Sequence, residues 1–173
     1  MEPRILIYHA EQCDPKKCTG IRLSRMNRGK ILKTMRQIPP RAVVLNPVSE
    51  VAFSRADREL IQKVGLVGLD CSWKQAETIF ANSRLGAQRA LPYLLAANPI
   101  NTYKPIKLST AEAIAAALYI AGFKDEAEDT MSVFKWGPSF ITLNQELLDA
   151  YAECASSTEV VQVQKEIMES QTR

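Results

Sequence analysis

Four short segments of the chain combine residue types suited to a charged, aromatic ligand. They are Asp14-Pro-Lys-Lys-Cys-Thr-Gly20, Leu45-Asn-Pro47, Leu69-Asp-Cys-Ser-Trp73 and Lys104-Pro-Ile-Lys-Leu-Ser-Thr110. Leu45, Pro47 and Trp73 offer an apolar, partly aromatic wall for a flat heterocycle. Asp70 offers a negative charge that favours a cation or accepts a proton. These segments therefore predict a binding site with both an apolar and an anionic part.

Two threonines add groups that suit a carboxylate. Thr19 and Thr110 offer hydroxyl and backbone donors, and a helix that begins at 109–112 adds a favourable dipole. S-adenosylmethionine has the matching parts, since it joins an aromatic base to a positive centre and a carboxylate. A purely structural interpretation stays open, with Trp73 as a core anchor, Asp70 in a turn and Thr110 in a helix cap.

The predicted secondary structure brings these segments to one edge of a sheet. Short apolar runs predict strands at 5–8, 42–45 and 65–70, of the kind buried in parallel sheets. Helices are predicted at 27–38, at 54–63, where Ser54 and Asp57 form a capping arrangement, and from about Trp73, where Ser72 and Gln75 form another. They alternate with these strands, and residues 10–24 are predicted as a loop. Ligands of open parallel sheets bind beyond the carboxyl ends of the strands. Segments 10–20, 45–48 and 69–73 should lie there, with 105–110 if a strand forms.

The second half of the chain is predicted to be mostly helical. A short helix is predicted over 92–98, and a capping box from Ser109 to Glu112 opens a helix over 113–121 that ends at Gly122. Further helices are expected near 124–134, 142–153 and 158–169. We therefore expect an α/β domain over residues 1–91 and a mostly helical domain over 92–173 that completes the site.

Composition and motifs exclude several classes of protein. Of the 173 residues, 46% are hydrophobic and 24% are charged, which excludes a disordered, collagenous or coiled-coil protein. No apolar run approaches a membrane span and no secretory signal pattern is present, so we expect a soluble, cytoplasmic protein. Dinucleotide and P-loop motifs are missing. The single histidine argues against a Ser-His-Asp triad. The spacing of Cys13, Cys18, Cys71 and Cys154 does not suit a tetrahedral site, and no metal is expected.

The charge of the chain is unevenly distributed. Residues 1–41 hold ten basic and three acidic residues, a net +7, and the remainder holds 12 basic and 16 acidic residues, a net −4, which together give +3. A basic segment on an acidic body suggests a polyanionic partner. A solvated surface explains the same bias equally well.

Several longer strings carry a family resemblance. They are Asp14-Pro-Lys-Lys-Cys-Thr-Gly20, Gly68-Leu-Asp-Cys-Ser-Trp73, Arg89-Ala-Leu-Pro-Tyr-Leu-Leu-Ala-Ala-Asn-Pro99, Lys104-Pro-Ile-Lys-Leu-Ser109 with Glu112-Ala113, and Phe134-Lys-Trp-Gly137. Together they closely resemble the aminocarboxypropyltransferases of small-subunit rRNA in archaea and eukaryotes, over roughly residues 4 to 154. The compact length is similar to that of the archaeal members.

The resemblance implies a fold and a reaction. The fold is a SPOUT-like α/β domain, with a parallel sheet and a deep trefoil knot, followed by a mainly helical C-terminal half. The reaction transfers the 3-amino-3-carboxypropyl group of S-adenosylmethionine to N3 of a pseudouridine, usually N1-methylated, and releases 5′-methylthioadenosine. The expected partner is small-subunit rRNA or a pre-ribosomal particle, and a monomer is favoured because the helical half covers the usual dimer surface.

The resemblance also implies individual contacts with the cofactor. Thr19 holds its amino-acid end and Thr110 its carboxylate. The remaining contacts are the Leu69 carbonyl at the ribose, the Leu91 N–H and Ile106 carbonyl at the adenine, and an apolar surround of Leu45, Pro47, Trp73 and Ala76. The resemblance places Asp70 near the sulfonium, and our hypothesis is that it stabilises the charge there or takes the N3 proton. If Trp73 and Ala76 bury the methyl group, only the aminocarboxypropyl carbon of the sulfonium faces the RNA.

Basic residues of the first quarter are expected to contact phosphates, which position the RNA rather than select its sequence. They are Lys17, Arg22, Arg25, Arg28, Lys30, Lys33 and Arg36. Two alternatives stay open at this point: a SPOUT-type RNA methyltransferase, and a ribosome-assembly factor that binds rRNA without catalysis.

Overall fold

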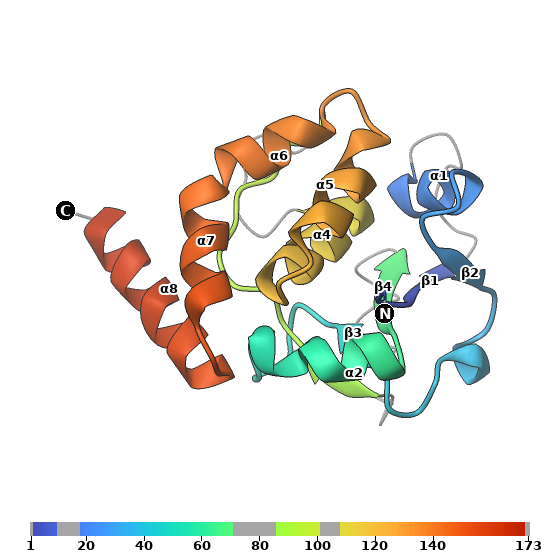
Figure 1. Cartoon of the computed structure of the whole chain (residues 1–173), viewed down its shortest axis with the longest axis horizontal. Coiled ribbons are helices and arrows are strands. Elements are labelled where there is room, and N and C mark those ends of the chain that lie inside the picture. Colours follow the sequence, from blue (N-terminus) through green and yellow to red (C-terminus); the bar gives the residue numbers. More distant parts are fainter. Residues whose placement is uncertain (1, 10–17, 71–85, 101–107, 172–173) are drawn as a thin grey trace.

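Five parallel strands form the centre of the molecule. The computed structural model describes residues 2–9, 18–70, 86–100 and 108–171 (Figure 1). The sheet has the order β2-β1-β4-β3-β5, and every pairing between its strands is parallel. The strands are β1 (Ile5–His9), β2 (Lys30–Leu32), β3 (Val43–Leu45), β4 (Leu66–Asp70) and β5 (Ala87–Arg89). The predicted parallel sheet and three of its strands are therefore confirmed.

Alternation along the central strands divides the apolar core between the two faces of the sheet. Ile7, Val43 and Leu66 belong to the larger cluster, which they share with the helices of the second half. Leu6, Val44 and Val67 belong to a smaller cluster. Because successive side chains of a strand point to opposite faces, this division explains why the central strands read as continuous apolar runs.

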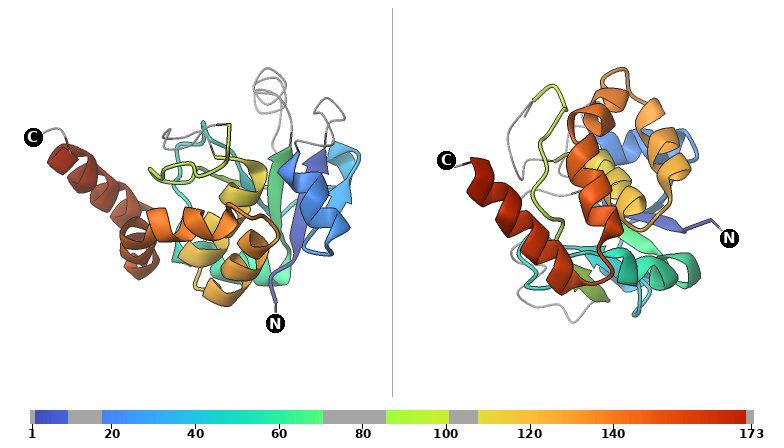
Figure 2. Two further views of the ribbon diagram at one scale, coloured as in Figure 1. Left: turned by 90° about the horizontal axis from the view of Figure 1, so that it is seen from above. Right: turned by 60° about the vertical axis from the view of Figure 1, so that its left-hand side comes forward.

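Helices of the second half gather on one side of the sheet (Figure 1). Helix α4 (Thr110–Ile120) is almost wholly buried, and it packs on β4, α1, α5 and α7. Figure 2 shows the last helix, α8, extending away from the sheet. The other helices and 3₁₀ turns are α1 (Thr19–Arg25), η1 (Met35–Gln37), η2 (Arg55–Asp57), α2 (Arg58–Lys63), α5 (Lys124–Ser132), α6 (Gly137–Leu143), α7 (Gln145–Glu153) and α8 (Ser157–Gln171).

The helix starts with capping boxes predicted at Ser54 and Ser109 are confirmed, and the one predicted at Ser72 lies outside the described residues. Ser54 accepts a hydrogen bond from the Ala56 N–H, and Ser109 accepts one from the Glu112 N–H. Gly122 follows α4 with a φ of +96°, which a glycine adopts without strain. The helices predicted near 124–134, 142–153 and 158–169 correspond to α5, α7 and α8, whereas α6 was not predicted.

The predicted helix over 27–38 is wrong. Asn27 has a φ of +58°, and the chain then enters β2, which pairs with β1 at the edge of the sheet. Close packing explains the difference, since a Cβ on Gly29 would lie 2.8 Å from the Ile7 side chain. The helical spacing of the apolar residues misled the prediction, because Met35 is exposed and only η1 is helical.

The loop predicted over 10–24 is wrong for residues 19–24, which belong to α1. This helix has no side-chain hydrogen bond at its N-cap residue, Cys18, so no capping residue marks its start in the sequence. It is held instead by tertiary packing, with Leu23 fully buried. Tertiary contacts thus override the weak local preference.

The short helix predicted over 92–98 is also wrong. Side chains from other elements bind alternate backbone N–H groups of this segment, at Tyr93, Leu95 and Ala97. Their acceptors are Gln164 of α8, Asn144 before α7 and Glu112 of α4, so the segment has no need of helical hydrogen bonds.

Strand β5 was not predicted because Ala87–Arg89 is not an apolar run. It follows Gly86, whose φ is +61° and whose added Cβ would lie 2.3 Å from the Ala42 carbonyl oxygen. The helix predicted from Trp73 lies outside the described residues, as does most of the conditional strand at 105–110. Within the described part of the chain, no helix is long and apolar enough to cross a membrane.

Candidate functional site

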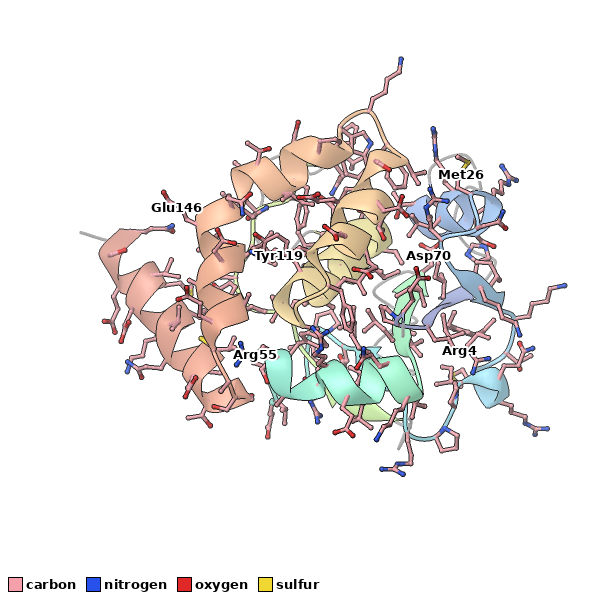
Figure 3. The ribbon with its side chains drawn as sticks, viewed as in Figure 1. Arg4, Met26, Arg55, Asp70, Tyr119 and Glu146 are labelled. Carbon is pink, nitrogen blue, oxygen red and sulfur yellow. The ribbon has the colours of Figure 1, made fainter. Side chains whose placement is uncertain are left out.

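Two neighbouring strands end at a pair of largely buried polar side chains. His9 closes β1 and Asp70 closes β4, and the parallel register places these two residues opposite each other. Figure 3 shows Asp70 at the carboxyl end of β4, beside α1. Ligands of parallel α/β sheets bind at this edge, so the prediction that Asp70 lies at a strand end is confirmed.

The first turn of α4 meets the end of β4. The Thr110 hydroxyl lies 3.1 Å from Asp70 Oδ1 and 3.3 Å from the Leu69 carbonyl oxygen, so its one proton is directed at either acceptor. Thr19 Oγ1 accepts a hydrogen bond of 3.0 Å from the Ala111 N–H. Four predicted site residues, Thr19, Leu69, Asp70 and Thr110, are therefore brought together.

Two glycines allow this close approach. A Cβ on Gly20 would lie 2.7 Å from Asp70 Oδ2, so α1 packs directly on the carboxylate. A Cβ on Gly68 would lie 2.9 Å from the Ile114 side chain and 3.2 Å from that of Thr110. The small residue at each position lets α1 and α4 reach the end of the same strand.

Glu112 fixes the start of α4 relative to the segment after β5. Its carboxylate is fully buried and accepts hydrogen bonds from four donors, the N–H groups of Ala97, Asn98 and Ser109 and the Asn98 side chain, at 2.6–3.2 Å. A buried carboxylate is tolerated when its oxygens are saturated in this way. Glu112 thereby ties the chain that follows Leu91 to the helix that carries Thr110.

The end of β3 forms a second part of the same sheet edge. Leu45 is buried and pairs in register with Arg89 of β5. Beyond it, Asn46 donates to the Gln88 side chain at 2.7 Å and accepts from the Val48 N–H at 2.9 Å. Pro47, predicted as part of the apolar surround, is exposed at this turn. Leu91 is partly buried two residues beyond Arg89 and lies against the larger core cluster.

His9 lies at the candidate site beside Asp70, although the sequence did not predict it there. Its Nδ1 atom is buried 3.4 Å from Asp70 Oδ2, and the His9, Cys18 and Asp70 side chains offer atoms within 4.8 Å of one another. The position of His9 directly after a predicted strand was the available indication, because the same reasoning selected Asp70. Trp73, Ala76, Ile106 and Lys17 lie outside the described residues.

The basic residues predicted for RNA surround α1 and β2. Arg22 lies over the Phe134 ring, 5.5 Å from its centroid, in a cation–π contact with the helical half. Arg28 donates to Asp129 of α5 at 3.1 Å and to the Met26 carbonyl at 2.6 Å. The side chains of Arg25, Lys30, Lys33 and Arg36 are exposed.

The fold and this edge define an α/β protein whose candidate binding site joins a strand-end carboxylate, two hydroxyls and a helix N-terminus. The ribosome biogenesis protein C-terminal family matches residues 43–168, and the chain belongs to the family of small-subunit rRNA aminocarboxypropyltransferases. This membership confirms the resemblance found in the sequence.

Relatives match over nearly their whole length. A 16S rRNA aminocarboxypropyltransferase of Methanosphaera stadtmanae is 53% identical over 95% of this chain and 97% of its own. One of Methanocaldococcus jannaschii is 48% identical over 96% of both chains. The solved SAM-dependent rRNA:acp-transferase Tsr3 of Vulcanisaeta distributa is 36% identical, with a TM-score of 0.86 over 95% of this chain and 97% of that one.

Residues 3–37 also resemble a possible Fer4-like domain of an RNase L inhibitor. Iron–sulfur clusters of this kind take four cysteine ligands, and this stretch holds Cys13 and Cys18 as its only cysteines. The resemblance therefore does not extend to a cluster-binding set within the stretch.

Proposed function

We propose that the chain transfers the 3-amino-3-carboxypropyl group of S-adenosylmethionine to N3 of a pseudouridine, usually N1-methylated, in small-subunit rRNA, with 5′-methylthioadenosine as the other product. The observation that carries this proposal is the convergence of Thr19, Leu69, Asp70 and Thr110 at one edge of the sheet. These residues come from three separate parts of a chain that matches named aminocarboxypropyltransferases over nearly its full length.

The described residues fit the charged parts of the cofactor. Asp70 offers a carboxylate for a positive centre, and the N-terminus of α4 offers a positive dipole end for a carboxylate. When bound, S-adenosylmethionine supplies an electrophilic carbon on a sulfonium. We assign Thr19 to the amino-acid end of the cofactor and Thr110 to its carboxylate. We assign the Leu69 carbonyl to the ribose, and the backbone of Leu91 and Ile106 to the adenine. The apolar surround is assigned to Leu45, Pro47, Trp73 and Ala76.

Orientation decides which group is transferred, because the acceptor must stand about 3–3.5 Å from the reacting carbon. We assign to Trp73 and Ala76 the burial of the methyl group. We assign to Asp70 the stabilisation of positive charge, with removal of the N3 proton as the alternative role. If Asp70→Asn transfers the group at an unchanged rate, Asp70 is not the base. If Trp73→Ala binds the cofactor with full affinity, Trp73 does not form part of the apolar surround.

A labelling experiment tests the reaction. The protein is incubated with an rRNA hairpin and S-adenosylmethionine labelled either in the methyl or in the carboxyl group. The proposal expects the carboxyl label alone in the RNA and methylthioadenosine as product. Methyl label in the RNA with S-adenosylhomocysteine would identify a methyltransferase, and RNA binding without cofactor binding would identify a non-catalytic assembly factor.

The exposed cations around α1 and β2 are proposed to contact RNA phosphates. Arg25, Lys30, Lys33 and Arg36 are exposed, and Arg22 and Lys17 complete the set. We assign Arg28 to the contact with Asp129 in preference to RNA, because its guanidinium already donates within the protein. Affinity for the hairpin should fall steeply with salt, and an affinity that barely changes would contradict this assignment.

Finer features of the fold are proposed with it. These are a SPOUT-like topology with a deep trefoil knot, a boundary near residue 91 between the two parts, a monomeric state and action on pre-ribosomal particles in the cytoplasm. The support is the family membership and the crossing of the chain from β4 past β3 to β5. Pulling on the termini should give an unfolded contour shorter than that of an unknotted chain, and light scattering should give the 19.3 kDa of one chain.

A further inference from the structure

We propose that His9 is a positioning residue for Asp70, and that a proton on its imidazole competes with the positive charge of the cofactor. The inference rests on the proposed function, because it requires S-adenosylmethionine to bind beside Asp70. Its first support is geometric: His9 and Asp70 are register partners at the ends of adjacent strands, with Nδ1 and Oδ2 3.4 Å apart.

Burial makes this contact strong enough to matter. The side chains of His9 and Asp70 are only 11% and 9% exposed, so little water screens the two groups. Among the described residues, His9 Nδ1 forms no hydrogen bond, which makes its contact with Asp70 electrostatic. Within the described ranges, Cys18 at the start of α1 is a further titratable group beside the imidazole.

The surrounding contacts hold the carboxylate in place. Thr110 approaches Oδ1, and Gly20 leaves no space for a Cβ beside Oδ2. The imidazole of His9 lies on a third side of the Asp70 carboxylate. Asp70 is therefore confined, and the charge on His9 decides how much of its negative charge is available to a cation.

Competition for one carboxylate gives a definite sign. Neutral His9 leaves the charge of Asp70 to the sulfonium, whereas protonated His9 partly neutralises that charge. Cofactor affinity should therefore be higher when the imidazole of His9 is neutral than when it is protonated, and by linkage cofactor binding should expel the proton. His9 is the only histidine of the chain, and histidine is the side chain whose ordinary charge change falls between pH 5 and 8.

Calorimetric titration with S-adenosylmethionine at pH 5.5 and 7.5 tests the proposal on the full chain and on His9→Gln. Between pH 7.5 and pH 5.5 the wild-type affinity should fall about fivefold or more beyond any fall seen in His9→Gln. Ionisation of the cofactor itself affects both proteins equally, so it cancels in the comparison. The same pH dependence in His9→Gln would overturn the proposal.

A second measurement needs no variant. The single imidazole gives one set of histidine signals in the NMR spectrum, and its titration midpoint should move to lower pH when the cofactor saturates the protein. An unchanged midpoint with bound cofactor overturns the role of His9 while leaving the proposed function intact. A protein that binds no S-adenosylmethionine at any pH contradicts the proposed function itself.

Discussion

Two carboxylates lie near opposite ends of α4, and they differ in burial and in the number of hydrogen-bond donors around them. Glu112, in the first turn, is fully buried and saturated by N–H donors. Asp149 of α7 meets Tyr119 in the last turn, and its side chain is 46% exposed beside Lys124 and Gln145 (Figure 3 labels Tyr119). Removing a buried, saturated ion leaves several donors unsatisfied, whereas removing an exposed one returns its partners to water. The end of α4 at the candidate site should therefore tolerate change least.

Glu112→Ala should have the largest effect. The donors on Ala97, Asn98 and Ser109 lose their shared acceptor in a dry environment, so the free energy of unfolding should fall by about 3 kcal/mol or more. Urea denaturation measures this loss. Glu128→Ala, at an exposed position of α5, should cost less than about 0.5 kcal/mol. Similar losses in the two variants would contradict the difference expected between a buried, saturated carboxylate and an exposed one.

Gly20→Ala should damage the site more than the fold. The new Cβ would lie 2.7 Å from Asp70 Oδ2, and the displaced carboxylate should weaken S-adenosylmethionine binding about tenfold or more, which is about 1.4 kcal/mol. Gly29→Ala is the matched control, because its Cβ would lie 2.8 Å from a flexible end of Ile7, away from Asp70. Calorimetry should show nearly unchanged cofactor affinity in that control. Equal losses in both variants would mean that general overpacking is responsible.

Arg25→Ala and Arg28→Ala should distinguish an exposed arginine that contacts RNA from one whose guanidinium is bonded within the protein. Arg25 is exposed in the last turn of α1, whereas Arg28 donates to Asp129 and Met26. Removal of Arg25 should reduce the slope of log affinity against log salt by about 1 for the rRNA hairpin. Removal of Arg28 should leave that slope unchanged. Fluorescence anisotropy over a salt series measures both, and a reduced slope in Arg28→Ala would return this residue to the RNA surface.

The Tyr119 and Asp149 pair should give the smallest effect, together with a dependence on pH. The hydrogen bond from Tyr119 lowers the pKa of Asp149, and burial raises the pKa of Tyr119. A lowered carboxyl pKa contributes stability at neutral pH that is lost as the pH falls. Tyr119→Phe should therefore cost less than about 1 kcal/mol at pH 7, and less still at pH 3. Thermal unfolding at the two pH values measures the difference, and a cost that grows in acid would contradict the assignment.

Sequence reasoning succeeded where local pattern and tertiary role agree. The strands at 5–8, 42–45 and 65–70 are apolar because both of their faces are buried, and the boxes at Ser54 and Ser109 cap helices by contacts within four residues. Position at strand ends then placed Asp70 and its neighbours at the site. These features can be read from neighbours in the chain.

It failed where distant contacts decide the conformation. Residues 92–98 are not helical because Gln164, Asn144 and Glu112 bind their backbone, and no residue within the segment indicates these contacts. Strand β5 depends on pairing with β3, and α1 on burial of Leu23. His9 escaped notice for a related reason, since its partner Asp70 is adjacent only through the pairing of β1 with β4.

The hydrogen bonds that converge on the first turn of α4 have a consequence for folding. Thr19, Leu69 and Ala97 are far apart in the chain, yet each is bonded to a residue between Thr110 and Glu112. Contacts of such long range form slowly, because loop closure precedes the gain they bring. We therefore expect the candidate site to be among the last features completed during folding. A ligand that binds only the completed site shifts the folding equilibrium toward the folded state. S-adenosylmethionine should therefore stabilise a newly made chain only after this site has formed.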